Sequence, residues 1–192
     1  MVNAFSCLLK KKVTGTRPLP DAEIEQTGRA IRREIDARFG RSLAIRELDA
    51  GSDNAAEIEI NNLSNAFYDV ERFGITFVAS PRHADVLLVT GAVTHNMEIA
   101  VRKTYDAMPS PKFVVAVGDD ACDGGIYNGT YAVLGGADKI LPVDLKIPGT
   151  PPTPTQILTG LLALMRAAGK NHKPSLPPHH SRIPGTLYTG KQ

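Results

Sequence analysis

Cysteines and long apolar runs are both scarce in this 192-residue chain. Two cysteines cannot build a four-thiolate zinc or iron–sulfur site, or the disulfide framework of a small secreted protein. The longest apolar runs, at 86–89 and 157–165, fall well short of the roughly 20 residues that cross a bilayer. We therefore expect one soluble domain with a substantial core and no membrane span.

Charge is nearly balanced, with 22 Lys and Arg against 20 Asp and Glu. The formal net charge of +2 gives no reason to expect a nucleic-acid binder. The distribution is uneven, because residues 1–19 and 169–192 each contain four basic residues and no acid. These tails either contact an anionic lipid surface or acidic neighbouring subunits, or they are simply solvated.

The spacing of apolar residues predicts alternating helices and strands. Helices are expected at 21–39, 57–70, 97–106, 126–134 and 155–168. Short β-branched or continuously apolar runs predict buried strands at 43–48, 75–79, 86–90, 113–117 and 140–145. This alternation indicates an α/β fold, a flavodoxin-like three-layer sandwich with a mostly parallel sheet and helices on both faces.

Four loops follow the carboxyl ends of the predicted strands, where parallel sheets form their sites. They cover 50–56, 91–96, 118–125 and 148–154. The third loop, G-D-D-A-C-D-G-G, is rich in glycine but matches neither the Walker A pattern nor the dinucleotide fingerprint. Prolines stiffen the fourth loop, P-G-T-P-P-T-P. Any site of this chain is expected where these loops meet.

Several stretches in unbroken order carry a resemblance to a known family. They are E-I-E-I at 57–60, E-R-F-G-I-T-F-V-A-S-P-R-H-A-D-V-L-L-V-T-G-A-V-T at 71–94, P-S-P-K-F-V-V-A-V-G at 109–118, G-G-I-Y at 124–127 and D-K-I-L-P-V-D-L-K-I-P-G-T-P-P-T-P at 138–154. The chain resembles the iron–sulfur small subunit shared by respiratory complex I, as its 20 kDa or B subunit of NADH-quinone oxidoreductase, and the membrane-bound [NiFe] energy-converting hydrogenases and formate hydrogenlyases. The resemblance covers roughly residues 43–168. We expect one α/β domain of this kind over 20–168, flanked by a basic segment at 1–19 and a Pro-rich basic tail at 169–192.

Members of this family hold one [4Fe–4S] cluster on cysteines at the end of the sheet. By the resemblance, the ligand positions fall on Ala50, Asp53, Ala56, Asp120 and Thr150. None of these five residues is a cysteine, and such clusters are held by thiolates with few exceptions. Every expected ligand is therefore missing. We therefore expect no cofactor, although the family implies a [4Fe–4S] cluster. Cys122 is either a relocated ligand or a small buried hydrophobe.

The acidic residues of the loops allow two interpretations each. Glu57 and Glu59 either interact with the dipole at a helix start or, by the resemblance, face the large subunit. Asp119, Asp120 and Asp123 form either a solvated loop or, if the loop is buried, a site for a hard cation.

A second polar group lies between two apolar strands. Arg82 and His83 belong either to a turn in which Arg82 pairs with Asp85, or to a subunit contact or proton relay near the electron site. His95 follows a predicted strand at its carboxyl end and is a candidate for the same pocket.

The resemblance and the missing ligands together predict a small subunit with a structural or coupling role, not catalytic alone. It would belong to a membrane-associated complex related to NADH-quinone oxidoreductase or an energy-converting hydrogenase. Its expected partners are a large-subunit homologue, other subunits and the membrane periphery, with no nucleic acid, in the cytoplasm at the inner face of the membrane. The alternatives are an electron-transfer subunit with an atypically ligated cluster or a quinone pocket, and a free-standing flavodoxin-like binder of nucleotide or flavin.

Overall fold

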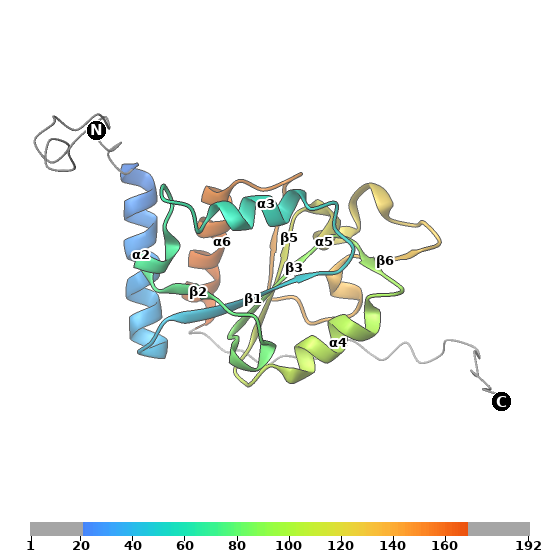
Figure 1. Ribbon diagram of the computed structural model, residues 1–192, viewed down its shortest axis with the longest axis horizontal. Coiled ribbons are helices and arrows are strands. Elements are labelled where there is room, and N and C mark those ends of the chain that lie inside the picture. The colour runs from blue at the N-terminus through green and yellow to red at the C-terminus, as the bar shows by residue number, and fades with distance from the viewer. Residues whose placement is uncertain (1–20, 169–192) are drawn as a thin grey trace, which may run out of the picture.

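A five-stranded parallel sheet forms the centre of the computed structural model, which describes residues 21–168 (Figure 1). Its strands are β1 (Leu43–Asp49), β2 (Ile75–Phe77), β3 (Val86–Thr90), β5 (Phe113–Val117) and β7 (Leu145–Ile147). The strand order is β2-β1-β3-β5-β7. The chain leaves β1 on one side to form β2 and crosses to the other side to form β3, as in flavodoxin-like sandwiches. The predicted α/β class is confirmed.

Helices cover both faces of the sheet. One face packs against α2 (Ala22–Phe39), α3 (Ala55–Asn62) and α6 (Pro154–Ala167), and the other against α4 (Glu98–Ala107) and α5 (Asp119–Asp123). Every residue of β3 and β5 is buried, which explains their continuously apolar sequences. Among the helices of residues 21–168, none has the length and apolar character needed to cross a bilayer.

The two long helices begin and end at residues that the sequence marks clearly. Asp21 caps α2 by accepting a hydrogen bond from the backbone N–H of Glu23, and Gly40 ends the helix in the left-handed conformation. Thr153 and Gln156 form a reciprocal capping box at the start of α6. The helices predicted at 21–39, 97–106 and 155–168 are therefore confirmed to within a residue or two.

The helix predicted over 57–70 is wrong in its second half. The helix α3 covers only Ala55–Asn62. The side chain of Asn65 then accepts the backbone N–H groups of Phe67 and Tyr68, and this local turn competes with helix continuation. The chain passes through Asp69 at a positive φ of 45° before it reaches β2.

The helix predicted over 126–134 is also wrong. A short 3-10 turn covers Gly125–Tyr127, and the segment then forms strand β6 (Val133–Gly135). This strand pairs antiparallel with β4 (Val93–Thr94), outside the main sheet. Gly129, between the 3-10 turn and β6, has a φ of 81°, a conformation that ends helical structure.

The remaining differences concern element boundaries. The strand predicted at 140–145 forms later, as β7, although Ile140 and Leu141 are buried in the core as expected. Pro142 explains the delay, because proline has no N–H to donate to a ladder. The strand predicted at 75–79 ends at Phe77, and the loop predicted at 118–125 contains α5. The basic segments at 1–19 and 169–192 lie outside the described residues.

Candidate functional site

The four predicted loops meet at the carboxyl edge of the sheet. A small cavity of about 20 Å³ there is lined by residues of all four loops, among them Ala56, Gly91, Gly118 and Pro151. A wider cavity of about 360 Å³ adjoins it, and we call this the acidic cavity. Its lining residues are Asp53, Asp119, Asp120, Asp123, Gly125, Ile126, Tyr127, Asn128 and Thr150.

Four of the five positions that the resemblance assigns to cluster ligands lie around these two cavities. Asp53, Asp120 and Thr150 line both cavities, and Ala56 lines the smaller one. They come from the loop after β1, from α3, from α5 and from the loop after β7. Residues distant in sequence are thus brought together at one edge.

Ala50 and Cys122 do not join this group. Ala50 is fully buried, and its backbone N–H donates to the carbonyl of Thr90 at 2.9 Å, so it extends the ladder between β1 and β3. Cys122 is buried on the other face of α5, and its Sγ lies 3.7 Å from the carbonyl oxygen of Ala116. Burial raises the pKa of the Cys122 thiol to about 11, which disfavours the thiolate needed to bind iron.

Asp119 fastens α5 to the loop after β7. Its carboxylate accepts the backbone N–H of Gly149 at 2.8 Å and the hydroxyl of Thr150 at 2.5 Å. The hydrogen bond from Thr150, and then that from Gly149, lower the pKa of Asp119. This contact could not be predicted from the sequence, because its partners are about thirty positions apart in the chain.

The other acids of the cavity are partly committed to their own loops. Asp53 accepts the backbone N–H of Ala55 at 3.0 Å, and Asp123 accepts that of Gly125 at 2.8 Å. Burial raises the pKa of Asp120, and repulsion from the neighbouring acids raises it further. Among these acids, Asp53 has the largest effect. Within residues 21–168, no group of three or more His, Cys, Asp or Glu side chains is placed to hold a metal ion.

The two glutamates of α3 differ in their surroundings. Glu57 is buried and accepts hydrogen bonds from the hydroxyls of Ser52, at 2.6 Å, and Thr90. It therefore joins the loop after β1 to the end of β3, and it also lies in the first turn of the helix. Glu59 is partly exposed and accepts a long hydrogen bond of 3.4 Å from the Asn62 amide. Sequence reasoning missed Ser52 and Thr90, although a threonine closing an apolar strand is a usable signal.

Arg82 and His83 lie in an exposed turn directly before β3, at the amino edge of the sheet. This placement contradicts a proton relay near the carboxyl-edge cavities. The predicted pairing of Arg82 with Asp85 is also wrong, because Asp85 pairs with Arg41 through two contacts of 2.7 and 2.8 Å. Asp85 also accepts the backbone N–H of Ala44, so it is fully used. His95 is exposed and lines neither cavity.

The side chains at the assigned ligand positions do not fit a [4Fe–4S] cluster. Such a cluster needs four sulfur donors, or histidine in exceptional cases. Asp53 and Asp120 offer hard carboxylate oxygens, Thr150 offers a hydroxyl, and the methyl group of Ala56 has no donor atom. No electron-transfer step through this group follows from the residues present.

Comparisons with known proteins agree with the resemblance. Over 156 residues the chain is 41% identical to a protein named formate hydrogenlyase subunit 7 from Escherichia coli (strain K12). The match covers 81% of this chain and 61% of that relative, so the chain spans well under the full length of its relative. A chain in the structure of the membrane-bound sulfane sulfur reductase, an archaeal respiratory membrane complex, matches with a TM-score of 0.60 at 35% identity. That match covers 72% of this chain and 75% of the other.

The family comparison covers the region in which the site lies. Residues 54–164 match the family described as NADH ubiquinone oxidoreductase, 20 Kd subunit. The matched stretch runs from the start of α3 through α6 and includes the positions of Ala56, Asp120 and Thr150. The chain therefore belongs to the family of the NADH ubiquinone oxidoreductase 20 kDa subunit.

Proposed function

We propose that this chain is a small subunit of a membrane-associated complex related to NADH-quinone oxidoreductase or formate hydrogenlyase, in which it has a structural or coupling role. The observation that carries this proposal is that the loop arrangement of the family is kept while the side chains at the ligand positions are replaced. The loops that hold the cluster in the family converge here around one edge, yet their side chains are Asp53, Ala56, Asp120 and Thr150. The chain then carries no electrons, because it has no cluster.

Partner subunits would bind where the family frame is preserved. The relatives are named as a subunit of formate hydrogenlyase and as part of a respiratory membrane complex. By analogy, a large-subunit homologue docks at the carboxyl edge, where Glu59 and the loop residues Ile126 and Tyr131 are available. Ile126 and Tyr131 are 86% and 97% exposed, and a partner surface would remove these apolar side chains from water. Arg82, His83 and His95 would serve contacts at other positions of the surface.

The second candidate is an electron-transfer subunit with an atypically ligated cluster. One observation favours it, because Asp53 and Asp120 line the same cavity. Against it, Cys122 does not line that cavity, so the only thiol described there cannot complete the ligand set.

Purification from native membranes tests the proposed function. We expect a tagged full-length chain to be isolated with stoichiometric partner subunits, including a large-subunit homologue, from washed membranes. Identification of the partners by mass spectrometry and measurement of the mass of the assembly would establish the complex. A chain that purified alone as a stable monomer from cells grown under several conditions would contradict the subunit role.

A further inference from the structure

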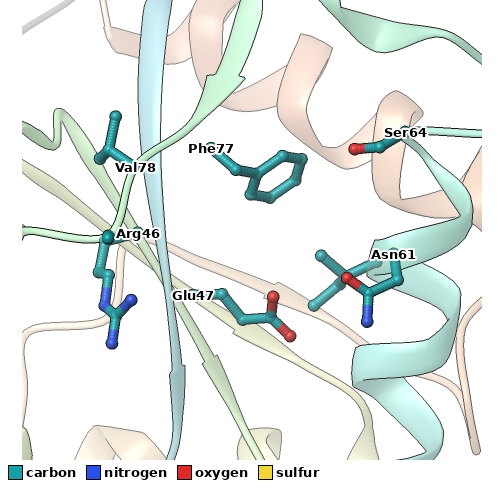
Figure 2. A pocket seen from close by; sticks show the side chains of 8 residues that line it. Arg46, Glu47, Asn61, Ser64, Phe77 and Val78 are labelled. Atoms are coloured by element: carbon teal, nitrogen blue, oxygen red, sulfur yellow. The ribbon is translucent and has the colours of Figure 1, made fainter.

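A further pocket, apart from the two cavities at the carboxyl edge, lies beside β1 on its β2 side, where the short strand β2 ends (Figure 2). It has a volume of about 270 Å³ and shares no lining residue with the acidic cavity. We call it the β1-edge pocket. Its lining residues are Arg46, Glu47, Ile60, Asn61, Ser64, Phe77, Val78 and Ala79.

The pocket exists because β2 is too short to cover β1. β2 pairs only with Leu43 to Ile45, and the backbone N–H of Val78 makes a last bond to the carbonyl of Ile45. The rest of β1, from Arg46 to Asp49, is paired with β3 on one side, and no strand of residues 21–168 pairs with it on the other. An uncovered strand edge of this kind is a natural place for another chain to bind.

Two of the lining residues each have a buried polar atom without a hydrogen-bond partner among residues 21–168. These atoms are Oε1 of Glu47 and Nε of Arg46. The two side chains point to opposite sides of β1, as successive strand residues do, so these two atoms do not pair with each other (Figure 2). A buried carboxylate oxygen without a donor costs free energy, and native structures rarely leave one unexplained.

Glu47 lies near two other carboxylates, those of Glu57 and Asp49. Burial raises the pKa of Glu47 to about 7, and the nearby charges of Glu57 and Asp49 also raise it. Arg46 lowers it, but by less than burial and Glu57 raise it. A cation placed in the pocket would reverse this unfavourable balance, whereas an anion would make it worse.

The remaining lining suits a long side chain with a polar end. Ile60, Phe77 and Val78 provide apolar surface, and Asn61 of α3 and Ser64, in the turn after α3, lie across from Glu47 (Figure 2). The side chains of Asn61 and Ser64 have no hydrogen-bond partner within the described part of the chain, and each has an oxygen that can accept. Lysine and arginine combine an aliphatic stem with a cationic head that only donates, so they match this lining.

We propose that the β1-edge pocket receives a lysine or arginine side chain of a neighbouring subunit, whose cationic head pairs with the carboxylate of Glu47. This inference rests on the proposed role of the chain as a subunit of a complex. The partner's backbone would lie along the uncovered edge of β1, and its basic side chain would supply the donor that Oε1 of Glu47 lacks. A purely apolar occupant would leave that oxygen unpaired.

The structure of the complex isolated through a tag on this chain is the direct test. We expect a lysine ammonium or an arginine guanidinium of another subunit within about 4 Å of the Glu47 carboxylate, the range of a salt bridge. A pocket that held water, an apolar side chain or a small molecule instead would overturn the inference and leave the subunit role intact. A chain isolated without partners would overturn the subunit role, and the inference with it.

A pair of isosteric variants gives a second, quantitative test. Glu47→Gln should weaken retention of the partner at least tenfold, because losing one member of a buried charge pair costs well over a tenfold change in affinity. The matched control is Glu71→Gln, which removes an exposed carboxylate outside the pocket and should change nothing. The full-length Glu47→Gln chain should be at least as heat-stable as wild type by itself. Equal retention of the partner by the two variants would contradict the proposal.

Discussion

The acidic cavity and the β1-edge pocket both contain carboxylates, but their carboxylates are used in different ways. In the acidic cavity, Asp53 and Asp123 each accept a backbone N–H group of their own loop, and Asp119 accepts that of Gly149 in the loop after β7. In the β1-edge pocket, one oxygen of Glu47 is buried and accepts no hydrogen bond from the described part of the chain. These three acids of the cavity therefore stabilise this chain's own loops, whereas no group of residues 21–168 donates to the buried oxygen of Glu47.

A cavity at the position of a family's site need not be the place where a member of that family binds another molecule. By the resemblance the acidic cavity lies where the family holds its cluster, but its side chains are not sulfur donors and its loops are joined by hydrogen bonds such as that from Thr150 to Asp119. None of the ligand positions that the resemblance assigns lies in the β1-edge pocket, yet this pocket contains the buried Oε1 of Glu47, which has no partner among residues 21–168. Four substitutions test whether the two regions really differ in this way.

The largest effect on stability is expected from Gly91→Ala, which disrupts the packing of the carboxyl-edge loops. Gly91 has a φ of 70°, and a Cβ there would lie 2.3 Å from the backbone nitrogen of Ser52. Because backbone rather than a flexible side chain must move, we expect a loss of about 3 kcal/mol or more in unfolding free energy. Chemical denaturation measures this loss.

Gly40→Ala is the matched control for that substitution. Gly40 also has a positive φ, of 60°, but a Cβ there meets nothing within 4 Å. We expect only the backbone cost, about 1 kcal/mol. Equal losses for the two variants would show that the loops are not tightly packed.

A smaller loss is expected when Glu57 is removed. Glu57→Ala deprives the hydroxyls of Ser52 and Thr90 of their acceptor, and Thr90 is fully buried. We expect a loss of about 2 kcal/mol in unfolding free energy, with part of it restored in Glu57→Gln, which keeps one carbonyl oxygen. If Glu57→Ala were neutral, the glutamate would act mainly through a partner, and the contrast between the two regions would disappear.

Glu47→Gln should change the pH dependence of stability rather than its maximum. The pKa of Glu47 rises from 4.5 to about 7 on folding, so the folded chain binds this proton more tightly than the unfolded chain. Its contribution is complete below about pH 4.5 and is lost as the pH rises to about 7. After allowance for solvent screening of this half-buried group, we expect a loss of about 1–2 kcal/mol across that window.

The measurement is the difference in unfolding free energy between wild type and Glu47→Gln from pH 4 to pH 8. The difference should shift in favour of the variant as the pH rises and level off above pH 7. A difference that stayed constant with pH would mean that Glu47 titrates normally and is not held in an unfavourable site.

The smallest effect is expected from Asp120→Asn. Repulsion from Asp53, Asp119 and Asp123 raises the pKa of Asp120, although burial contributes most. Removing one charge from this exposed cluster should raise stability at neutral pH by a few tenths of a kcal/mol, because solvent screens such charges. Thermal unfolding at low and high salt should show the gain shrinking as salt increases. A large loss instead would mean that Asp120 holds the cavity together.

The layered fold could be predicted from the sequence because its strands are strongly patterned. The runs at Val86–Thr90 and Phe113–Val117 are buried on both faces, and Asp21, Gly40 and Thr153 mark helix ends by simple capping chemistry. The segment at 126–134 could not be predicted in the same way. Its strand β6 exists only because it pairs with β4, about forty positions earlier, and such pairing overrides local helical spacing.

The location of the site could be predicted better than its contacts. The rule that loops meet at the carboxyl edge correctly placed Asp53, Asp120 and Thr150 together. Ala50 was misplaced because its backbone continues the ladder of β1, and Asp85 was given the wrong partner because Arg41 is distant in sequence. Glu47 was overlooked, although a charged residue inside an apolar strand was visible in the run L-A-I-R-E-L-D.

The most direct test of the central claim, that this chain keeps the small-subunit frame without the cluster, is its iron content. The full-length chain would be purified without oxygen, incubated with ferrous iron, sulfide and a thiol, desalted, and examined by iron and sulfide determination and by electron paramagnetic resonance after reduction. We expect far less than one iron per chain and no cluster signal. About four irons per chain, with a [4Fe–4S] signal that Asp120→Ala or Cys122→Ala abolishes, would contradict it.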